Sequence, residues 1–391
     1  MSSTYSIQDQ VAIVGLGYTP YLRDSQKTTM GLVADAARMA IRDAGLTAKD
    51  INGLAGPQLR ADLVQGALGI PEVTYFLQTT LPPFFQQLFA AMHAVHAGIC
   101  DTALVYHVAY VGAHNSRAAA ADPFRRPRGG GFGGGLKQGA PWPDSIAGTA
   151  CYATWANRYL HEYNRTREDF GYVAINNRTN ASVNEHAIQR EPMTMDDYLS
   201  ARMVRDPLGI YDMDFPIDGA EAVVVTTAER AKDMAKRPVF LHAASEGQTD
   251  HAVEEEMPDL AHQGQQVCVK NLWERTDLSI DDIDLFQPYD GFSPMSLSWL
   301  EVFYCGLGEG GAFMADNWNK EKNRLEIGGR VLMNTHGGSL SDGASQGAGH
   351  TREAILQLRG EAGARQVEGV ERALVCPGGY FFNAGAYILR V

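Results

Sequence analysis

The chain has 391 residues, of which 45% are hydrophobic and 20% are charged, and its formal net charge is −13 at pH 7. This length allows one large globular unit or two fused half-domains with substantial cores, and the composition excludes a disordered chain. The negative charge argues against a general nucleic-acid-binding protein, because neutralising phosphates requires a basic face.

Targeting signals and cysteine spacing bear on the compartment. The first ten residues lack the cationic start and apolar core of a secretory signal, and no uninterrupted apolar run reaches the length of a membrane span. The five cysteines are scattered and include no CxxC pair. We therefore expect no disulfide framework, no metal site and a reducing, cytoplasmic compartment.

The chain begins with a strand and a helix. Residues 11–17 are a short apolar run closed by glycines, which predicts a buried strand. Apolar residues at helical spacing between positions 32 and 44 then predict a helix. Thr28 or Thr29 is the expected cap, and Gly45 the expected end.

A second helix and a second strand follow the first pair. Residues 86–98 have the helical pattern, and residues 102–106 are again a short apolar run. The alternation of strand and helix predicts a layered α/β fold with a largely parallel central sheet.

Two segments of the chain have similar sequences at later positions, which we call echoes. Residues 44–54 align with residues 276–286, and both combine a helix end, a Leu-(Thr/Ser) turn and an Asp-Ile pair before a strand. Residues 103–105 match residues 373–375 in the same order. Two echoes in one order predict a duplicated α/β unit.

A long segment between the two units interrupts the pattern. Residues 111–215 begin with a stretch punctuated by glycine and proline, and continue with an aromatic part of helical character. Long insertions of this kind usually carry function. We divide the chain into a first half over residues 1–230, which contains the insertion, and a second half over residues 231–391.

Six segments together resemble one known family, the thiolase superfamily, in its sterol-carrier-protein-type thiolase and lipid-transfer branch. They are residues 11–17, 177–184, 218–225, 308–313, 334–340 and 357–360. The resemblance implies two βαβαβαββ halves in five layers (α-β-α-β-α), with a loop domain inserted in the first half. It also implies a coenzyme A thioester as substrate, with no tightly bound cofactor.

Two parts of thiolase chemistry are missing from this chain. The family's nucleophilic cysteine would fall near Leu81, where no cysteine, serine or lysine stands. The histidine of the family's Gly-His-Pro motif is replaced by Ala344. Both changes argue against the acyl-enzyme route of an ordinary thiolase.

Two other parts are altered. The turn that orients the oxyanion water in thiolases reads Tyr289-Asp-Gly-Phe292 here, and it resembles the turn of lipid-transfer relatives that act as aldolases. In those relatives the tyrosine takes part in C–C cleavage. The C-terminal cysteine loop reads Cys376-Pro-Gly-Gly-Tyr380.

The candidate catalytic residues are Tyr289, His336, Cys376 and His350. Each has a plainer alternative. Tyr289 would otherwise be a strand-end tyrosine, Cys376 an inert buried thiol, His336 a solvated turn residue and His350 part of a helix start. Tyr289 needs a lowered pKa or a proton relay to act as a base near neutrality.

The arginines Arg125, Arg126 and Arg128 are candidates for binding the phosphates of coenzyme A, because guanidinium groups suit phosphate geometry. Ordinary surface charge is the alternative.

These features predict a retro-aldolase-like lyase that acts on a β-hydroxyacyl-CoA with a bulky, sterol-like or aromatic tail. Two alternatives stay open: a thiolase that cleaves a 3-oxoacyl-CoA through Cys376, and a non-catalytic subunit that binds acyl-CoA. The resemblance further implies a homodimer and a separate small partner protein with an OB fold and a zinc ribbon.

Overall fold

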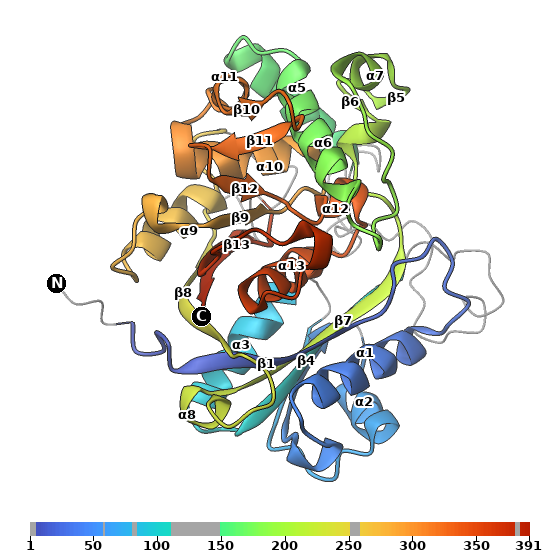
Figure 1. The fold of residues 1–391 in the computed structure, drawn as a ribbon, viewed down its shortest axis with the longest axis vertical. Coiled ribbons are helices and arrows are strands. Elements are labelled where there is room, and N and C mark those ends of the chain that lie inside the picture. The colour runs from blue at the N-terminus through green and yellow to red at the C-terminus, as the bar shows by residue number, and fades with distance from the viewer. Residues whose placement is uncertain (1–4, 58, 80–83, 111–148, 251–258, 380–383) are drawn as a thin grey trace.

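The structure is a computed structural model that describes residues 5–57, 59–79, 84–110, 149–250, 259–379 and 384–391. Its first part consists of alternating strands and helices, drawn in blue and cyan (Figure 1). They are β1 (Val11–Tyr18), α1 (Thr29–Asp43), η1 (Ala48–Asp50), β2 (Gly53–Pro57), α2 (Ala61–Leu68), β3 (Tyr75–Thr79), α3 (Phe84–His96) and β4 (Thr102–Tyr110).

The predicted elements of this part are confirmed. The β1 strand covers the predicted segment, and α1 begins after Thr28, whose hydroxyl accepts a hydrogen bond from the Gly31 amide at 3.1 Å. Gly45 follows the helix with a φ of 74°, a conformation that suits glycine at a helix end. The α3 helix and the β4 strand match the second predicted pair.

The described part of the insertion is mostly helical and lies beside the second half of the chain (Figure 1). It contains α5 (Thr149–Glu162), α6 (Glu168–Ala181), α7 (Met195–Ser200), β5 (Met203–Arg205), β6 (Leu208–Gly209) and η2 (Ile210–Asp212). The glycine-rich start that we noted in the sequence lies outside the described residues. The predicted helical character of the later part is confirmed by α5.

The remaining elements complete the sheet and its cover. They are β7 (Asp218–Thr227), α8 (Ala228–Ala231), β8 (Val239–Gly247), α9 (Gly264–Trp273), η4 (Ile280–Asp282), β9 (Leu285–Pro288), α10 (Ser293–Leu300), η5 (Glu301–Cys305), α11 (Gly310–Asp316), β10 (Trp318–Asn319), β11 (Arg324–Ile327), β12 (Val331–Met333), α12 (Gly338–Ser341), α13 (Ala348–Arg359), η6 (Gly363–Arg365), β13 (Arg372–Cys376) and β14 (Ala384–Arg390). The η5 segment is a π-helix that continues directly from α10.

The large sheet is continuous through both halves of the chain. In the described residues its order is β10-β11-β12-β9-β13-β14-β8-β1-β7-β4-β2-β3. The halves join where Ala12 and Ile13 of β1 pair with Phe240 and Val239 of β8. The two half-sheets therefore share a hydrogen-bonded seam.

The expectation of a largely parallel sheet is wrong. Parallel pairing occurs between β2 and its neighbours β3 and β4, and between β9 and its neighbours β12 and β13. The strands between these two groups pair antiparallel. For β13 and β14 the reason is the length of the connection, because residues 377–383 are too few for the crossover that parallel neighbours require.

The duplication inferred from the echoes is visible in the structure. In both echoes a short 3₁₀ helix precedes the strand, and an aspartate three residues on accepts hydrogen bonds from the amide and hydroxyl of Thr47 or Ser279. Leu54 of β2 pairs with Leu104 of β4, and Phe286 of β9 pairs with Leu374 of β13. The repeated segments therefore form equivalent pairs of parallel strands, β2 with β4 in the first half and β9 with β13 in the second. The boundary at residue 230 stays a prediction.

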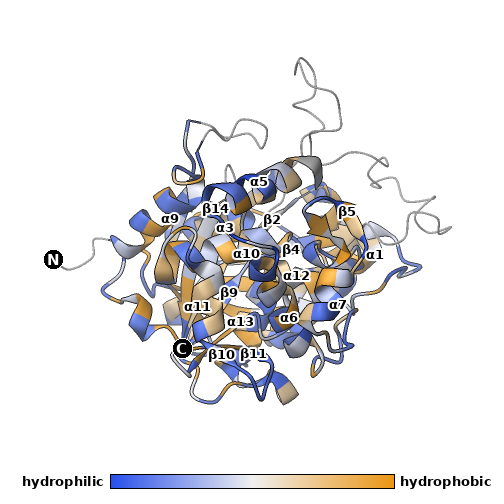
Figure 2. Ribbon diagram, turned by 90° about the horizontal axis from the view of Figure 1, so that it is seen from above, coloured by the Kyte–Doolittle hydropathy of each residue, from blue (hydrophilic) through white to orange (hydrophobic). Residues whose placement is uncertain are grey.

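The helices and the two half-sheets form five layers, as expected for this fold. Three large apolar clusters fill the space between the layers. The α1 and α2 helices pack on the outer face of the first half-sheet, and α3 and α13 lie between the two half-sheets. The α6, α9 and α10 helices cover the outer face of the second half-sheet. Figure 2 shows the hydrophobic residues gathered in the interior and hydrophilic ones along the rim.

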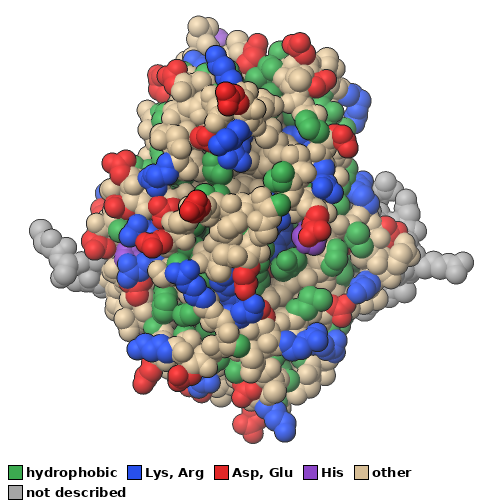
Figure 3. Space-filling view, in the orientation of Figure 1, with side chains coloured by type: hydrophobic (Ala, Val, Ile, Leu, Met, Phe, Trp, Pro, Cys, Tyr) green, Lys and Arg blue, Asp and Glu red, His purple; other side chains and the backbone are tan. Residues whose placement is uncertain are grey.

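The surface gives two further constraints. On the face seen in Figure 3, the basic and acidic side chains of the described residues are interspersed. None of the helices in the described ranges is both long enough and apolar enough to span a bilayer.

The close contact of β1 with α1 gives a stability prediction. A Cβ at Gly15 would lie 2.2 Å from the backbone oxygen of Ala40, so Gly15→Ala must push the helix off the sheet. We expect it to lower the free energy of unfolding by about 1–3 kcal/mol. Gly66→Ala is the matched control, because nothing lies within 4 Å of its added Cβ on α2. It should raise stability by up to about 1 kcal/mol.

Denaturant unfolding of both variants measures these changes. Equal effects at the two positions would contradict the packing argument.

Candidate active site

The candidate site lies where three neighbouring parallel strands end. Met333 of β12 pairs with Phe286 of β9, and Cys376 of β13 pairs with Pro288 at the end of β9. The loops that leave these strands therefore meet at one edge of the sheet, the position where open α/β sheets bind ligands.

Asp290 is the centre of this edge. Its Oδ1 accepts hydrogen bonds from the Ser339 amide at 2.6 Å and from His350 Nε2 at 3.0 Å. Its Oδ2 accepts from Asn177 Nδ2 at 2.6 Å and from the Leu340 amide at 3.1 Å. The side chain is fully buried. Four donors from separate segments thus hold one buried carboxyl group.

The two candidate histidines lie side by side next to this carboxylate. His350, the third residue of α13, is completely buried, and its ring centroid is 4.8 Å from that of His336, with the rings edge to face. The hydrogen bond from His350 Nε2 to Asp290 fixes the orientation of this ring. Nδ1 of each histidine has no hydrogen-bond partner among the described residues. This burial does not fit a solvated turn residue, the plainer alternative for His336, whereas His350 does lie at a helix start.

His336 is held in its neutral form. Burial lowers the pKa of His336 well below its ordinary value, and His350 and the cations of Arg352 and Arg365 lower it further. A neutral imidazole can donate or accept a hydrogen bond without carrying a charge into the site.

The loop that follows His336 requires glycines, because its backbone passes close to the Asp290 side chain. Gly337 and Gly338 have φ values of 105° and 62°. A Cβ at Gly338 would lie 2.0 Å from the Asp290 carboxylate. Only glycine therefore permits the backbone to wrap around this group.

Tyr289 lies on the other side of His350, with ring centroids 5.8 Å apart. Its side chain is partly exposed and packs with Cys151 and Trp155 of α5. Tyr152 of the same helix stacks on Phe292 at 4.2 Å. The inserted segment thus places an aromatic wall over the candidate base.

The Cys376 carbonyl accepts a hydrogen bond from the Tyr289 amide at 2.8 Å, but the Cys376 side chain lies apart from this cluster. Its side chain is fully buried within the apolar core under α9 and α10, close to Cys268. Burial raises the pKa of the Cys376 thiol well above its ordinary value. Nucleophilic attack requires the thiolate, so this environment disfavours such a role. The plainer alternative, an inert buried thiol, fits the described contacts better.

A network of buried charged side chains lies next to the site. Arg352 of α13 bonds to Asp342, and its Nη1 lies 3.3 Å from Glu221 of β7. All three side chains are buried. Burial raises the pKa of Glu221 to about 8, with Arg352 opposing the shift and Asp342 adding to it. The network ties the first half-sheet to the helix that carries His350.

Several residues singled out in the sequence lie outside the described residues. These are Leu81, Tyr380 and the candidate phosphate ligands Arg125, Arg126 and Arg128, whose role stays a prediction. No group of three or more His, Cys, Asp or Glu side chains suited to a metal ion occurs in the part of the chain that is described.

The sequence analysis missed three residues that shape this site. Asp290 stands in the same turn as Tyr289, and Asn177 stands in one of the segments that carry the resemblance. Both residues lie in segments that resemble the thiolase family, and this position could have marked them as candidates. Asp214 lies far from both in sequence and had no such signal, but burial and the nearby Asp290 charge raise its pKa to about 7.

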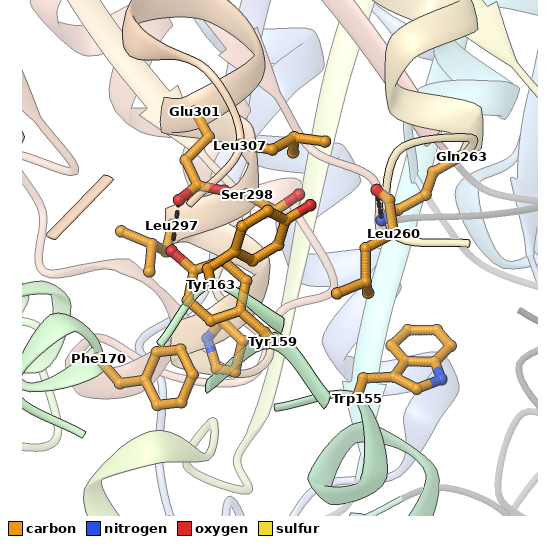
Figure 4. A pocket seen from close by; sticks show the side chains of 11 residues that line it. Trp155, Tyr159, Tyr163, Phe170, Leu260, Gln263, Leu297, Ser298, Glu301 and Leu307 are labelled. Carbon is orange, nitrogen blue, oxygen red and sulfur yellow. Dashed lines mark hydrogen bonds between the residues drawn. The ribbon is translucent and has the colours of Figure 1, made fainter. Parts of the chain in front are cut away.

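A small recess adjoins the aromatic wall (Figure 4). Its lining includes Trp155, Tyr159, Phe170 and Glu301, and its volume is about 20 Å³, enough for one water molecule. Glu301 Oε1 accepts hydrogen bonds from the Tyr159 hydroxyl at 2.5 Å and from the Gly308 and Gly310 amides. Its Oε2 has no partner among the described residues. The recess thus combines aromatic walls with one unsatisfied carboxyl oxygen.

Comparison with known proteins gives the same picture. A family model described as thiolase C-terminal domain-like matches residues 247–390. The chain is 32% identical to the 17-hydroxy-3-oxo-4-pregnene-20-carboxyl-CoA lyase of Mycobacterium tuberculosis, over 95% of this chain and 97% of that protein. It is 33% identical to the steroid side-chain-cleaving aldolase of Thermomonospora curvata, over 94% of each.

Solved structures show the same fold. The Ltp2-ChsH2(DUF35) aldolase matches with a TM-score of 0.84 and 28% identity, over 98% of both chains. Human mitochondrial 3-ketoacyl-CoA thiolase in complex with CoA matches with a TM-score of 0.66 and 16% identity, over 98% of this chain and 99% of that one. At that identity the second match concerns the fold alone.

The chain belongs to the thiolase superfamily, in its thiolase-like aldolase branch. The predicted family, the two-half thiolase fold and the assignment to an acyl-CoA lyase of this fold are thereby confirmed.

The recess around Glu301 gives a pH prediction. Burial raises the pKa of Glu301 from 4.5 to about 7. Between these pH values the folded protein keeps a proton that the unfolded chain releases, so stability falls as the pH rises. Glu301→Gln removes this titration. We expect the stability of the wild type relative to this variant to fall by up to about 3 kcal/mol from pH 4.5 to pH 8.

Denaturant titrations of both proteins across this pH range measure the difference. A constant difference would mean that Glu301 titrates at its ordinary pKa.

Proposed function

We propose that this chain is a retro-aldolase that cleaves a β-hydroxyacyl-CoA into a carbonyl compound and a shortened acyl-CoA. The observation that carries the proposal is the grouping of Tyr289, His350 and His336 around the Asp290 carboxylate, with the Cys376 thiol buried elsewhere. This set can move protons but offers no activated nucleophile.

The proposed chemistry requires one base and one anion-stabilising group. Tyr289 is the proposed base for the β-hydroxyl, because it is the partly exposed residue of the set. When the Cα–Cβ bond breaks, its electron pair passes to the thioester as an enolate. A neutral His336 is the proposed donor to the enolate oxygen, and a preorganised buried donor stabilises such a charge strongly. His350, oriented by Asp290, positions His336.

The aromatic wall supports a bulky acyl tail. Tyr152 and Trp155 of α5 lie with Phe292 beside Tyr289, and flat aromatic surfaces suit ring systems. The names of the two similar enzymes refer to steroid side chains and a pregnene carboxyl-CoA. We propose a fused-ring, sterol-like tail for this chain.

Proposed partners and compartment follow the same comparison. The Ltp2-ChsH2(DUF35) structure contains a second protein component by its title, which supports a small partner protein for this chain. An OB fold with a zinc ribbon remains the proposed form of that partner. Free thiols at all five cysteines support the proposed reducing, cytoplasmic compartment.

The role of Tyr289 is tested by Tyr289→Phe in the complex with the partner protein. Loss of the hydroxyl should lower kcat for retro-aldol cleavage by at least about 100-fold, because the base is removed. Tyr75→Phe on β3 is the matched control and should keep full activity. The assay follows release of the carbonyl product from a sterol-type β-hydroxyacyl-CoA.

The alternatives give different results. Mass spectrometry after incubation with a 3-oxoacyl-CoA should find no acyl adduct on Cys376. An adduct there would favour the thiolase alternative. A wild-type complex without turnover on any β-hydroxyacyl-CoA would favour the non-catalytic subunit.

We also propose a homodimer formed through the β3 edge of the sheet. The β3 strand is last in the strand order, and Phe76 on it is 71% exposed. An exposed edge strand with a large apolar side chain invites pairing with a second chain. Phe76→Glu should shift the protein from dimer to monomer in sedimentation velocity. Val183→Glu, on a different exposed surface, is the control and should leave the dimer intact.

A further inference from the structure

The segment around Asp214 is fixed between the two loops of the candidate site. Met213 forms an isolated antiparallel bridge with Phe292, and the Asp214 amide donates to the Gly291 carbonyl at 3.1 Å. On its other side, the Phe215 amide donates to the Ser339 carbonyl at 3.2 Å. Asp214 is therefore held against the turn that carries Tyr289 and Asp290.

This pairing decides where the Asp214 side chain points. Directly opposite residues of an antiparallel pair project to the same face, with Cβ atoms about 4.5–5.5 Å apart. Since Met213 is opposite Phe292, Asp214 is opposite Gly291. Gly291 has no side chain, and a Cβ built on it would lie 2.6 Å from the Tyr289 hydroxyl oxygen. The Tyr289 phenol thus lies over Gly291, on the face of this pair to which the Asp214 side chain projects.

The two aspartates near this turn differ in what holds them. Asp290 accepts hydrogen bonds from four donors, whereas no described residue donates a hydrogen bond to the Asp214 carboxyl. Burial, with the charge of Asp290, raises its pKa to about 7. It can therefore exchange a proton near neutrality.

We propose that Asp214 is the group that takes the proton of Tyr289, so that the phenol can act as a base on the β-hydroxyl. This proposal rests on the retro-aldolase function above. It supplies the relay that a tyrosine needs near pH 7.

The proton count balances within the site. The β-hydroxyl proton moves to the Tyr289 oxygen while the phenolic proton moves to Asp214. The β-oxygen forms its carbonyl, the Cα–Cβ bond breaks, and the electron pair becomes the thioester enolate. The proton then returns from Asp214 through Tyr289 to the α-carbon. No oxidant, reductant or further reactant is consumed.

Other charged groups around Asp214 are tied to partners of their own. Asp212 accepts from Tyr198 and Ser293, Asp342 bonds to Arg352, and Arg23 donates to the Pro216 carbonyl. Asp290 and His350 bond to each other. The His350 ring lies beside Tyr289, so the experiment must separate any effect of His350 from that of Asp214.

The test compares the pH dependence of kcat for the wild type and Asp214→Asn, assayed as the complex with its partner protein. The wild-type rate should fall on the acid side of about pH 7 as the carboxylate is protonated. Asp214→Asn should lower kcat about 100-fold and remove this acid limb. Asp281→Asn, at an exposed aspartate, is the control and should keep the wild-type profile.

Two further variants guard against a purely structural effect. Asp214→Glu keeps a carboxyl and should keep the acid limb. Asp214→Ala should regain activity in proportion to added formate, which can enter the space of the lost carboxyl.

Failure of the proton relay and failure of the proposed lyase function give different results. If Tyr289→Phe is inactive while Asp214→Asn keeps both the rate and the acid limb, the relay is wrong and the lyase function stands. An acid limb that survives in Asp214→Asn at a reduced rate assigns the titration to a group other than Asp214 and also overturns the relay. Absence of retro-aldol turnover in the wild type would overturn the proposed function itself.

Discussion

The buried Asp290 carboxylate is the interaction on which the candidate site depends. Its four donors come from α6, from α13 and from the backbone at the start of α12. An unpaired charge in this position would be costly, so each of these segments must be in place for the carboxylate to be stable. One side chain thereby fixes the inserted segment and both loops of the second half relative to one another.

This constraint also explains how the thiolase fold can host different chemistry. The edge formed by β12, β9 and β13 gathers the loops that carry Tyr289, His336 and Cys376. The thiol that remains there, Cys376, points into the core, where burial keeps it protonated. The groups that face one another are a phenol, two imidazoles and two carboxyls. Such a set is suited to proton transfer rather than to acyl transfer.

Much of the fold was predictable from local patterns. The β1 strand, the α1 helix with its Thr28 cap, and the paired echoes before β2 and β9 each follow from residues close in sequence. The direction of the central strands was not predictable in this way. Strand direction depends on which segments meet across the sheet, and β8 meets β1 from the other half of the chain.

The sequence by itself determined the family and the absence of the usual nucleophile near Leu81, and it made Tyr289 and the two histidines candidates. Only the tertiary structure decided that His350 binds Asp290, that Cys376 is buried elsewhere and that Asp214 faces the Tyr289 turn. The physical reason is that these relations are contacts between distant segments. Motifs record which residue types are present, whereas burial and partners set their protonation and their chemistry.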